Sequence, residues 1–248
     1  MTTLSIISIC QDEAEVIPWY LDCCEYTYRV LGPKWLKEVV IVDGGSVDKT
    51  IDIIKSYQDR MPLVLVEHPF DTFGAQKNRA LDVATGEFIL ACDTDMSWTT
   101  NFGLVFKSGY YENFEMVDFR MMFTVDDEYH YFKWPPGVNM RLWKNCGRRY
   151  VTGFHEKLQD QQLLTKNMGG LPVCEHVVLF ENSFRQSDAA LLNRGQRYQR
   201  FFKEMADEGK DPGGVDKYFN AKHCPPDQKA EMHWQLKELI LPQIKTPI

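Results

Sequence analysis

Asp93 and Asp95 are two carboxylates with one residue between them, and their type and spacing point to chemistry. They follow the apolar run 88–92, which has the pattern of a strand buried on both faces, as in a parallel sheet under helices. In an extended chain, side chains two residues apart point the same way, so both acids project from the strand's carboxyl end, where ligands of α/β sheets collect. Oxygen ligands suit Mg²⁺ or Mn²⁺, so the pair predicts a divalent metal site. The competing interpretation is a strand-end turn with two solvated acids.

The elements that would position these acids alternate between strands and helices over the first hundred residues. Apolar runs predict buried strands at 4–10, 38–43 and 87–92 and a further strand at 63–67. Helical patterns separate these strands, and Asp12 is expected to cap the first helix. Alternation with short loops implies right-handed parallel crossovers, and therefore one doubly wound α/β sheet.

The second half of the chain has a different pattern. Residues 116–134 contain two apolar or aromatic runs around an acidic turn, which predicts a β-hairpin, and residues 139–143 predict a further strand. Helices are expected to begin at Ser187 and at Asp227. No change in composition marks a second domain, so this half is expected to pack on the first.

The net charge is −7, in an otherwise ordinary composition of 44% hydrophobic and 25% charged residues. A negative chain disfavours broad attraction to nucleic acid or to an anionic membrane, so no stable nucleic-acid partner is expected. The apolar runs are too short for a transmembrane segment, and the N-terminus lacks the pattern of a secretory signal. The seven cysteines form no C-x-x-C pair, which favours reduced thiols in a cytoplasmic protein.

Several short motifs occur in a characteristic order along residues 4–200. They are Gln11-Asp12-Glu13, Asp43-Gly-Gly-Ser46-x-Asp48-x-Thr50, Gly74-x-x-Lys77-Asn78-x-Ala80, Asp93-x-Asp95 and Gly153-Phe-His155-Glu156-Lys-Leu158. This order resembles the family 2 glycosyltransferases of GT-A fold, which move a sugar from a nucleoside diphosphate to an acceptor. The resemblance implies a Rossmann-like, mostly parallel sheet flanked by helices, with a C-terminal hairpin and helical elaboration. It further implies one GT-A domain over 1–248, in which 1–98 bind the nucleotide sugar, 99–206 form the acceptor and metal half, and 207–248 are a C-terminal helical extension.

The resemblance also implies a donor site and a metal site. The residues implied for the nucleotide sugar are Cys10, Asp12, Glu13, Asp43, Gly74, Lys77, Asp93 and Thr94. Asp95 is implied as a direct ligand of Mn²⁺ or Mg²⁺, with Asp93 reaching the ribose or the metal through water, and His176 as a later ligand. Two interpretations of Lys77 stay open, a contact with phosphate and a solvated position on a helix. Two also stay open for His176, a metal ligand and an ordinary residue on the sheet surface. Many members have Asp-Asp where this chain has Asp43-Gly44, so one nucleoside contact is in doubt.

The transfer needs a base, because family members as a rule invert the anomeric centre by attack of an acceptor hydroxyl. Glu156 takes the place of the family's catalytic acidic residue. A second interpretation gives the proton transfer to His155, with Glu156 as its orienting partner, and a third makes both residues structural. Trp134, Arg141 and Trp143 are expected to border the acceptor site, because aromatic faces suit sugar rings and Arg suits phosphate. The alternative is a hydrophobic hairpin that packs on the sheet.

The resemblance implies a UDP-sugar donor and a hexosyl- or N-acetylhexosaminyltransferase. The expected acceptor is a hydroxyl on a glycan or a lipid-linked precursor, followed by a protein side chain and then by a modified nucleobase in DNA. Two other classes compete. A nucleotidyltransferase would carry a basic Gly-rich loop after the first strand, where this chain has the acidic residues 11–13, and a scaffold protein would bind nucleotide sugars without turnover. The oligomeric state stays open.

Overall fold

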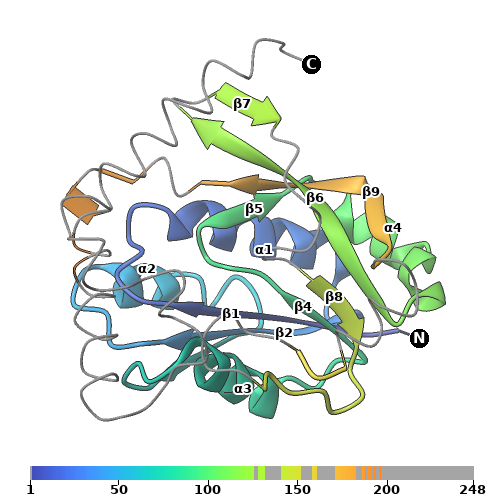
Figure 1. Cartoon of the computed structure of the whole chain (residues 1–248), viewed down its shortest axis with the longest axis horizontal. Helices are drawn as coiled ribbons and strands as arrows, with labels where there is room; N and C mark the ends of the chain where they lie inside the picture. The colour runs from blue at the N-terminus through green and yellow to red at the C-terminus, as the bar shows by residue number, and fades with distance from the viewer. Residues whose placement is uncertain are drawn as a thin grey trace.

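The computed structural model describes residues 2–125, 128–131, 141–151, 158–160 and 171–182, together with residues 186, 187, 189, 190, 193 and 196. The described strands are β1 (Leu4–Cys10), β2 (Leu36–Asp43), β3 (Leu63–Glu67), β4 (Phe88–Ala91), β5 (Met96–Trp98), β6 (Met116–Val125), β7 (Glu128–Tyr131), β8 (Arg141–Lys144) and β9 (Val173–Glu181). The described helices are α1 (Ile17–Leu31), α2 (Thr50–Lys55), α3 (Phe73–Val83), α4 (Phe102–Lys107) and the 3-10 helix η1 (Tyr110–Asn113). These strands form one sheet in the order β3-β2-β1-β4-β8-β6-β9-β5, with β7 paired to β6 (Figure 1).

The first four strands form the parallel half of the sheet. β1 pairs in parallel with β2 and β4, and β2 pairs in parallel with β3. These pairings confirm the four strands that the apolar runs predict, of which β1, β2 and β4 are buried, whereas β3 at the sheet edge is buried only at Leu63. Cys10 lies opposite Asp43 in the register, so the carboxyl ends of β1 and β2 meet at one edge of the sheet, where the following loops carry the acidic motifs.

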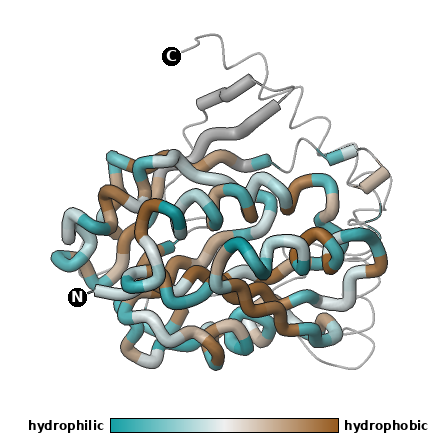
Figure 2. Tube along the Cα trace, turned by 180° about the vertical axis from the view of Figure 1, so that it is seen from behind, coloured by the Kyte–Doolittle hydropathy of each residue, from teal (hydrophilic) through white to brown (hydrophobic). Residues whose placement is uncertain are grey.

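Helices cover both faces of this parallel half (Figure 1). Ile6 and Ile41 join a core with residues of α1, α2 and α4 on one face, whereas Ile7 and Val40 join a second core with Ala80 of α3 on the other. This alternation is the period of two that a strand imposes on its side chains. Hydrophobic segments concentrate along the central strands (Figure 2). The doubly wound α/β architecture is therefore confirmed.

The second half extends the sheet with strands of both directions. β8 runs antiparallel to β4 and β6, β6 pairs with β7 in a hairpin, and β9 runs parallel to β6 and antiparallel to β5. Within the described residues, this confirms the predicted hairpin as β6 and β7 and the predicted strand before Trp143 as β8. The sequence did not predict β5, α4 or η1, because segments of three to six residues are too short to reveal a period. None of the described helices has both the length and the apolar surface that crossing a bilayer requires.

A buried hydrogen-bond network fixes the turn between α3 and the amino end of β4, the strand that leads to Asp93 and Asp95. Glu38 of β2 accepts hydrogen bonds from the Thr85 N–H at 2.7 Å and the Thr85 hydroxyl at 2.9 Å, and a further one from the Ser5 hydroxyl. The Gly86 N–H donates to Ser5 Oγ at 2.7 Å. A β-carbon on Gly86 would lie 2.5 Å from the Ser5 nitrogen and 2.6 Å from the Leu4 carbonyl carbon. The turn can therefore approach β1 this closely only because residue 86 is a glycine.

Gly86→Ala is expected to destabilise the protein, because the added methyl group meets backbone that cannot rotate away. Overpacking of this kind costs about 1–3 kcal/mol, and each kcal/mol lowers Tm by about 2–4 °C in a chain of this size. Gly103→Ala is the comparison variant and should lose less Tm, because its β-carbon would meet only side-chain atoms, Val30 Cγ1 at 2.8 Å and Val30 Cβ at 3.1 Å, and alanine favours the helix. Calorimetry on both variants checks the prediction, and an equal Tm for the two would contradict it.

Candidate active site at the sheet edge

The loop after β1 presents Asp12 to the loop after β2. Asp12 has a positive φ of 54°, its N–H donates to Ser46 Oγ at 2.8 Å, and its Oδ1 accepts from the Val47 N–H at 2.7 Å. Helix α1 begins at Ile17, after Val16, and has no side-chain cap. The prediction that Asp12 caps this helix was therefore wrong. Its carboxylate binds the backbone of the neighbouring loop, which fixes the two loops against each other.

The two glutamates of this loop hold a segment far away in the sequence. The buried Glu13 accepts a hydrogen bond at Oε2 from Gln186 Nε2 at 2.9 Å, and its N–H donates to Thr50 Oγ1 at 2.8 Å. Glu15 accepts hydrogen bonds from the Ser187 N–H at 2.6 Å and the Ser187 hydroxyl at 2.8 Å. Glu13 therefore anchors residue 186 to the loop between β1 and α1, a task that the sequence did not indicate.

Asp43 is enclosed within the loop that follows β2. It is fully buried, and its Oδ1 accepts hydrogen bonds from the N–H groups of Gly45 and Ser46, both at 2.8 Å. The Ser46 hydroxyl donates to Oδ2, and Cys10 Sγ lies 3.5 Å from the same oxygen. Burial, and the Asp43 carboxylate beside it, raise the pKa of the Cys10 thiol. Cys10 therefore stays protonated at neutral pH and acts as a donor to Asp43.

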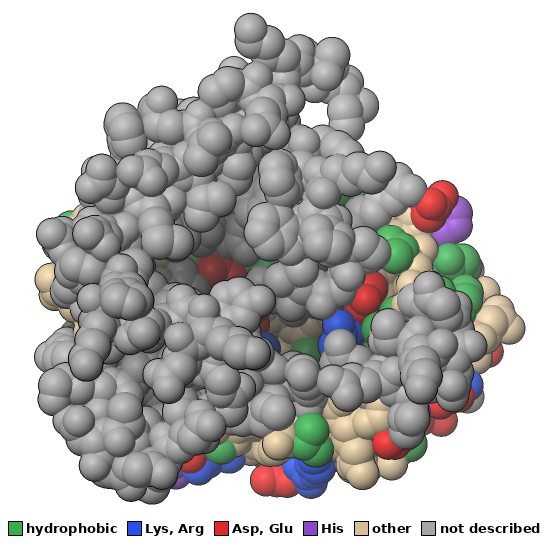
Figure 3. Space-filling model, viewed as in Figure 1, with side chains coloured by type: hydrophobic (Ala, Val, Ile, Leu, Met, Phe, Trp, Pro, Cys, Tyr) green, Lys and Arg blue, Asp and Glu red, His purple; other side chains and the backbone are tan. Residues whose placement is uncertain are grey.

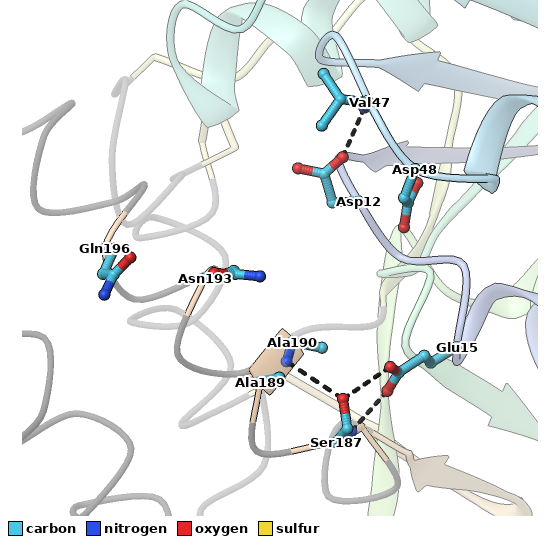
Figure 4. A pocket seen from close by; sticks show the side chains of 9 residues that line it. All are labelled: Asp12, Glu15, Val47, Asp48, Ser187, Ala189, Ala190, Asn193 and Gln196. Atoms are coloured by element: carbon cyan, nitrogen blue, oxygen red, sulfur yellow. Dashed lines mark hydrogen bonds between the residues drawn. The ribbon is translucent and has the colours of Figure 1, made fainter.

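A pocket of about 400 Å³ opens next to these two loops. Asp12, Val47 and Asp48 line one side of it, and Ser187 and Asn193 line the opposite side (Figure 4). The lining carries the carboxylates of Asp12, Glu15 and Asp48 and the amides of Asn193 and Gln196. The Glu15–Ser187 hydrogen bonds lie at its rim (Figure 4). Contacts between the β1–α1 loop and residues 186 and 187 thus hold the two walls together.

Helix α3 brings a lysine to the end of β4. Lys77 Nζ lies 3.2 Å from Asp93 Oδ1, with side-chain exposures of 11% and 30%. Gly74 is buried in the first turn of the same helix, which Thr72 caps by accepting a hydrogen bond from the Ala75 N–H at 3.1 Å. A solvated helix lysine would be largely exposed, so the burial of Lys77 removes that interpretation. Acidic and basic side chains lie side by side near the middle of the face in Figure 3.

The acidic pair occupies a turn and not an extended strand end. The Met96 N–H donates to the Asp93 carbonyl oxygen at 3.1 Å, which closes a turn over residues 93–96. Asp95 is buried with 6% exposure, and Thr94 is buried with its hydroxyl 3.3 Å from the Ile9 carbonyl oxygen. The expectation that the two side chains project in parallel from an extended chain was therefore wrong. Both carboxylates nevertheless stay at the carboxyl end of β4.

His176 lies away from the turn that carries Asp93 and Asp95. The chain reaches the turn directly after β9, where the Asn182 N–H donates to the Asp95 carbonyl oxygen at 2.7 Å. His176 precedes Val178, and the regular stretch 178–181 alone spans about 10 Å at roughly 3.3 Å per residue. The exposed His176 ring packs edge-on against Tyr110 with centroids 5.1 Å apart. The structure does not bring His176 together with Asp93 and Asp95, because ligands of one ion lie within a few ångströms of each other.

The donor chemistry of Asp93 and Asp95 fits a hard divalent cation that also binds substrate. Among the residues that the structure describes, no group of three or more His, Cys, Asp or Glu side chains gathers as a metal cluster. Mg²⁺ typically binds through one or two carboxylates together with water and substrate phosphates, and Mn²⁺ favours the same oxygen ligands. Because Lys77 already pairs with Asp93, Asp95 is the carboxylate better suited to hold the ion.

The structure places the residues expected at the acceptor site or as the base in three different ways. Arg141 forms an ion pair with Asp118, with Nε 2.8 Å from Oδ1 and side-chain exposures of 13% and 5%. Trp143 is buried in the core between the sheet and α3, so its expected role at the acceptor site was wrong and the packing alternative holds. Trp134, His155 and Glu156 lie outside the described residues.

Sequence reasoning missed three residues that shape the site. Ser46 binds both Asp12 and Asp43, and its place in the motif Asp43-Gly-Gly-Ser46 was the signal that could have identified it. Gln186 and Tyr150 contact residues more than 70 positions away. Neither lies in a motif, so no pattern in a single sequence could have identified them.

Ligands of open α/β sheets collect at the carboxyl edge of the strands, and here that edge carries acidic and basic side chains. The family model described as "Glycosyl transferase family 2" matches residues 5–170, which include the loops that follow β1, β2 and β4. The chain belongs to this family. This membership confirms the family that the order of motifs indicated.

Two curated relatives match short stretches of the chain. The uncharacterized glycosyltransferase YibD of Escherichia coli (strain K12) is 35% identical over 60 residues, which are 23% of this chain and 17% of YibD. The poly(ribitol-phosphate) β-N-acetylglucosaminyltransferase TarS of Staphylococcus aureus (strain Mu50 / ATCC 700699) is 38% identical over 65 residues, which are 25% of this chain and 11% of TarS. The matched stretches thus span less than a fifth of either relative.

Solved structures share the fold. S. aureus TarS 1–349 superposes with a TM-score of 0.56 at 16% identity, over 93% of this chain and 78% of that one. The same TarS fragment in complex with UDP-GlcNAc gives 0.55 at 15% identity, over 93% and 79%. The mannosyltransferase PcManGT from Pyrobaculum calidifontis, in complex with GDP-Man and Mn²⁺, gives 0.53 at 21% identity, over 89% and 69%. At these identities the likeness shows the fold, which is therefore that of the GT-A glycosyltransferases.

Proposed function

We propose that this chain is a metal-dependent, inverting glycosyltransferase that moves a sugar from a nucleoside diphosphate sugar to an acceptor hydroxyl. One observation carries the proposal. Lys77 and Asp93 form a largely buried ion pair beside Asp95, at the ligand-binding edge of a family 2 fold. A cation next to two carboxylates suits a diphosphate together with its divalent counter-ion.

The proposal gives each described residue a physical task. Asp12, which lines the pocket, contacts the nucleoside, and Asp43 and Cys10 shape the loop behind it. Lys77 donates hydrogen bonds to the diphosphate and neutralises part of its charge. Asp95 would hold Mn²⁺ or Mg²⁺, which when bound supplies Lewis-acid stabilisation of the leaving nucleotide. The His176 ring is far from this edge and takes no part.

The proton of the acceptor hydroxyl is assigned to Glu156, which lies outside the described residues. The hydroxyl oxygen attacks the anomeric carbon, the bond to the diphosphate oxygen breaks, and the electron pair of that bond leaves with the nucleotide. A carboxylate that removes the proton also stabilises positive charge on the sugar ring in an oxocarbenium-like transition state. His155 is the alternative base, with Glu156 as its orienting partner.

A UDP-sugar is the first donor to test. Support comes from fold neighbours that bind UDP-GlcNAc in one case and GDP-Man with Mn²⁺ in another. The acceptor is proposed to be a glycan or lipid-linked hydroxyl, ahead of a protein side chain or a modified nucleobase. Incubation with Mn²⁺ and a panel of nucleotide sugars, followed by measurement of free nucleotide, tests the donor and the activity together. Release from one donor that stops on chelation supports the proposal, whereas binding without release would indicate a scaffold.

Lys77→Met is expected to weaken UDP binding by about tenfold or more, because a charge-assisted hydrogen bond contributes about 1.5–3 kcal/mol. Methionine keeps the apolar stem and removes only the charged head. The affinity for uridine, which has no phosphate, should stay unchanged. Calorimetric titration with UDP and uridine checks both expectations. An equal loss for the two ligands would mean that Lys77 supports the loop and does not contact the diphosphate.

A further inference from the structure

Asn78 binds both backbone polar groups of one residue far away in the sequence. Its Nδ2 donates to the Tyr150 carbonyl oxygen at 2.9 Å, and its Oδ1 accepts from the Tyr150 N–H at 2.9 Å. A carboxamide carries a donor and an acceptor side by side, so it pairs with a backbone as a neighbouring strand would. The Arg149 guanidinium adds a hydrogen bond to the Asn78 carbonyl oxygen at 3.0 Å. Residues 149 and 150 are therefore fixed to helix α3.

The clamped residue is also bridged to the chain that follows it. Tyr150 and Leu158 form an antiparallel bridge, and the Gln159 N–H donates to the Arg149 carbonyl oxygen at 2.8 Å. Leu158 is buried in the core between the sheet and α3. In the sequence, residues 152–157 lie between these two anchors and include His155 and Glu156. Asn78 thus holds one end of the stretch that carries both candidate bases, and the Tyr150–Leu158 bridge ties the other end to it.

The residue before Asn78 contacts the donor side of the same site. Lys77 Nζ lies 3.2 Å from Asp93 Oδ1 and 5.7 Å from the centroid of the Tyr150 ring. The Tyr150 ring in turn packs edge-on against Trp143, with centroids 6.3 Å apart. One turn of α3 therefore contacts the acidic turn after β4 through Lys77 and the segment before the candidate bases through Asn78.

We propose that Asn78 is a positioning residue, which fixes residues 149 and 150, the start of the stretch that carries the proposed base, relative to the edge at Asp93 and Asp95. The proposal rests on the proposed function. The physical reason is that a helix is stiff over one turn, so two contacts from adjacent residues transmit a fixed geometry between the donor and the base. Misplacement of a reacting group by about 1 Å costs about 100-fold in rate, and the rate therefore depends on this clamp.

Asn78→Ala is expected to lower kcat about 10- to 100-fold and to leave the Kd of UDP unchanged, measured with the UDP-sugar that the wild type consumes fastest. Asn78→Asp should give an intermediate kcat, because a carboxylate accepts from the Tyr150 N–H but cannot donate to the Tyr150 carbonyl. This second variant also keeps the test open if the alanine variant does not fold. Asp82→Asn is the matched control, since it removes the Arg149–Asp82 ion pair, whose partners are 44% and 62% exposed. Its kcat should equal that of the wild type.

Hydrogen exchange supplies a readout that does not depend on turnover. The Tyr150 amide should exchange faster in Asn78→Ala than in the wild type. Faster exchange with an unchanged kcat would overturn the proposal, and so would a rise in the Kd of UDP that matches the fall in kcat. A wild type without turnover on any donor would overturn the proposed function and this inference together, whereas a wild type with turnover and an Asn78→Ala variant of equal kcat would overturn only the inference.

Discussion

Asp95→Ala is expected to abolish metal-dependent release of nucleotide and transfer of sugar, with a loss of about a thousandfold or more. A divalent ion contributes several kcal/mol of charge stabilisation to the leaving group, and each 1.36 kcal/mol is about tenfold in rate. Asp93 is a poorer replacement, because the Lys77 ammonium lies 3.2 Å from its Oδ1 and competes with a cation. The affinity for Mn²⁺ in the presence of UDP, measured by calorimetry, should fall in parallel with the activity.

Two control variants separate loss of the metal ligand from loss of the fold. Asp95→Asn keeps the shape of this buried side chain and removes its charge, so it should lose activity and keep its Tm. Glu67→Gln changes a 56% exposed carboxylate at the end of β3, on the same sheet edge, and should keep full activity. Strong Mn²⁺ binding and normal turnover in Asp95→Asn would contradict the assignment of the metal to this residue.

The parallel half of the sheet was predictable because its physical signals are local. The runs at Leu4–Cys10 and Leu63–Glu67 are apolar and bounded by polar residues, and the structure keeps these bounds. The start of helix α3 was also predictable from the local sequence, and the structure begins this helix at Phe73. The carboxyl-edge location of Asp93 and Asp95 followed from the same reasoning, because a buried parallel strand defines its own ligand end.

The orientation of individual side chains was less predictable, because it depends on partners distant in the sequence. Asp12 looked like a helix cap, yet its carboxylate binds the Val47 N–H across two loops. Asp93 and Asp95 looked like a parallel pair, yet a single hydrogen bond from the Met96 N–H turns the chain. His176 matched a motif position, but motif order carries no information about where along β9 the turn is reached. Whether Asp43 and Glu13 contact a nucleoside stays a prediction.

Glu156→Gln is expected to reduce transfer by about 100- to 10,000-fold, the usual contribution of a general base. The amide has almost the same size as the carboxylate, so the UDP site should be unaffected and the Kd of UDP unchanged. Nucleotide release and UDP binding, measured on the same preparation, check the two expectations. Transfer at nearly the wild-type rate would contradict the assignment of the base to Glu156.

The pH dependence of kcat distinguishes Glu156 from His155 as the base. An unperturbed glutamate loses its basic form below about pH 4.3 and an unperturbed histidine below about pH 6.5, so the acidic limb of the wild-type profile lies at different pH for the two assignments. If Glu156 is the base, Glu156→Gln removes this limb and His155→Gln shifts it only slightly. If His155 is the base, His155→Gln has the larger loss of kcat, and Glu156→Gln keeps the limb but moves it to lower pH, because an orienting carboxylate raises the pKa of the imidazole that it contacts. Whether the acidic limb of Glu156→Gln disappears or moves to lower pH therefore decides which of the two residues removes the proton.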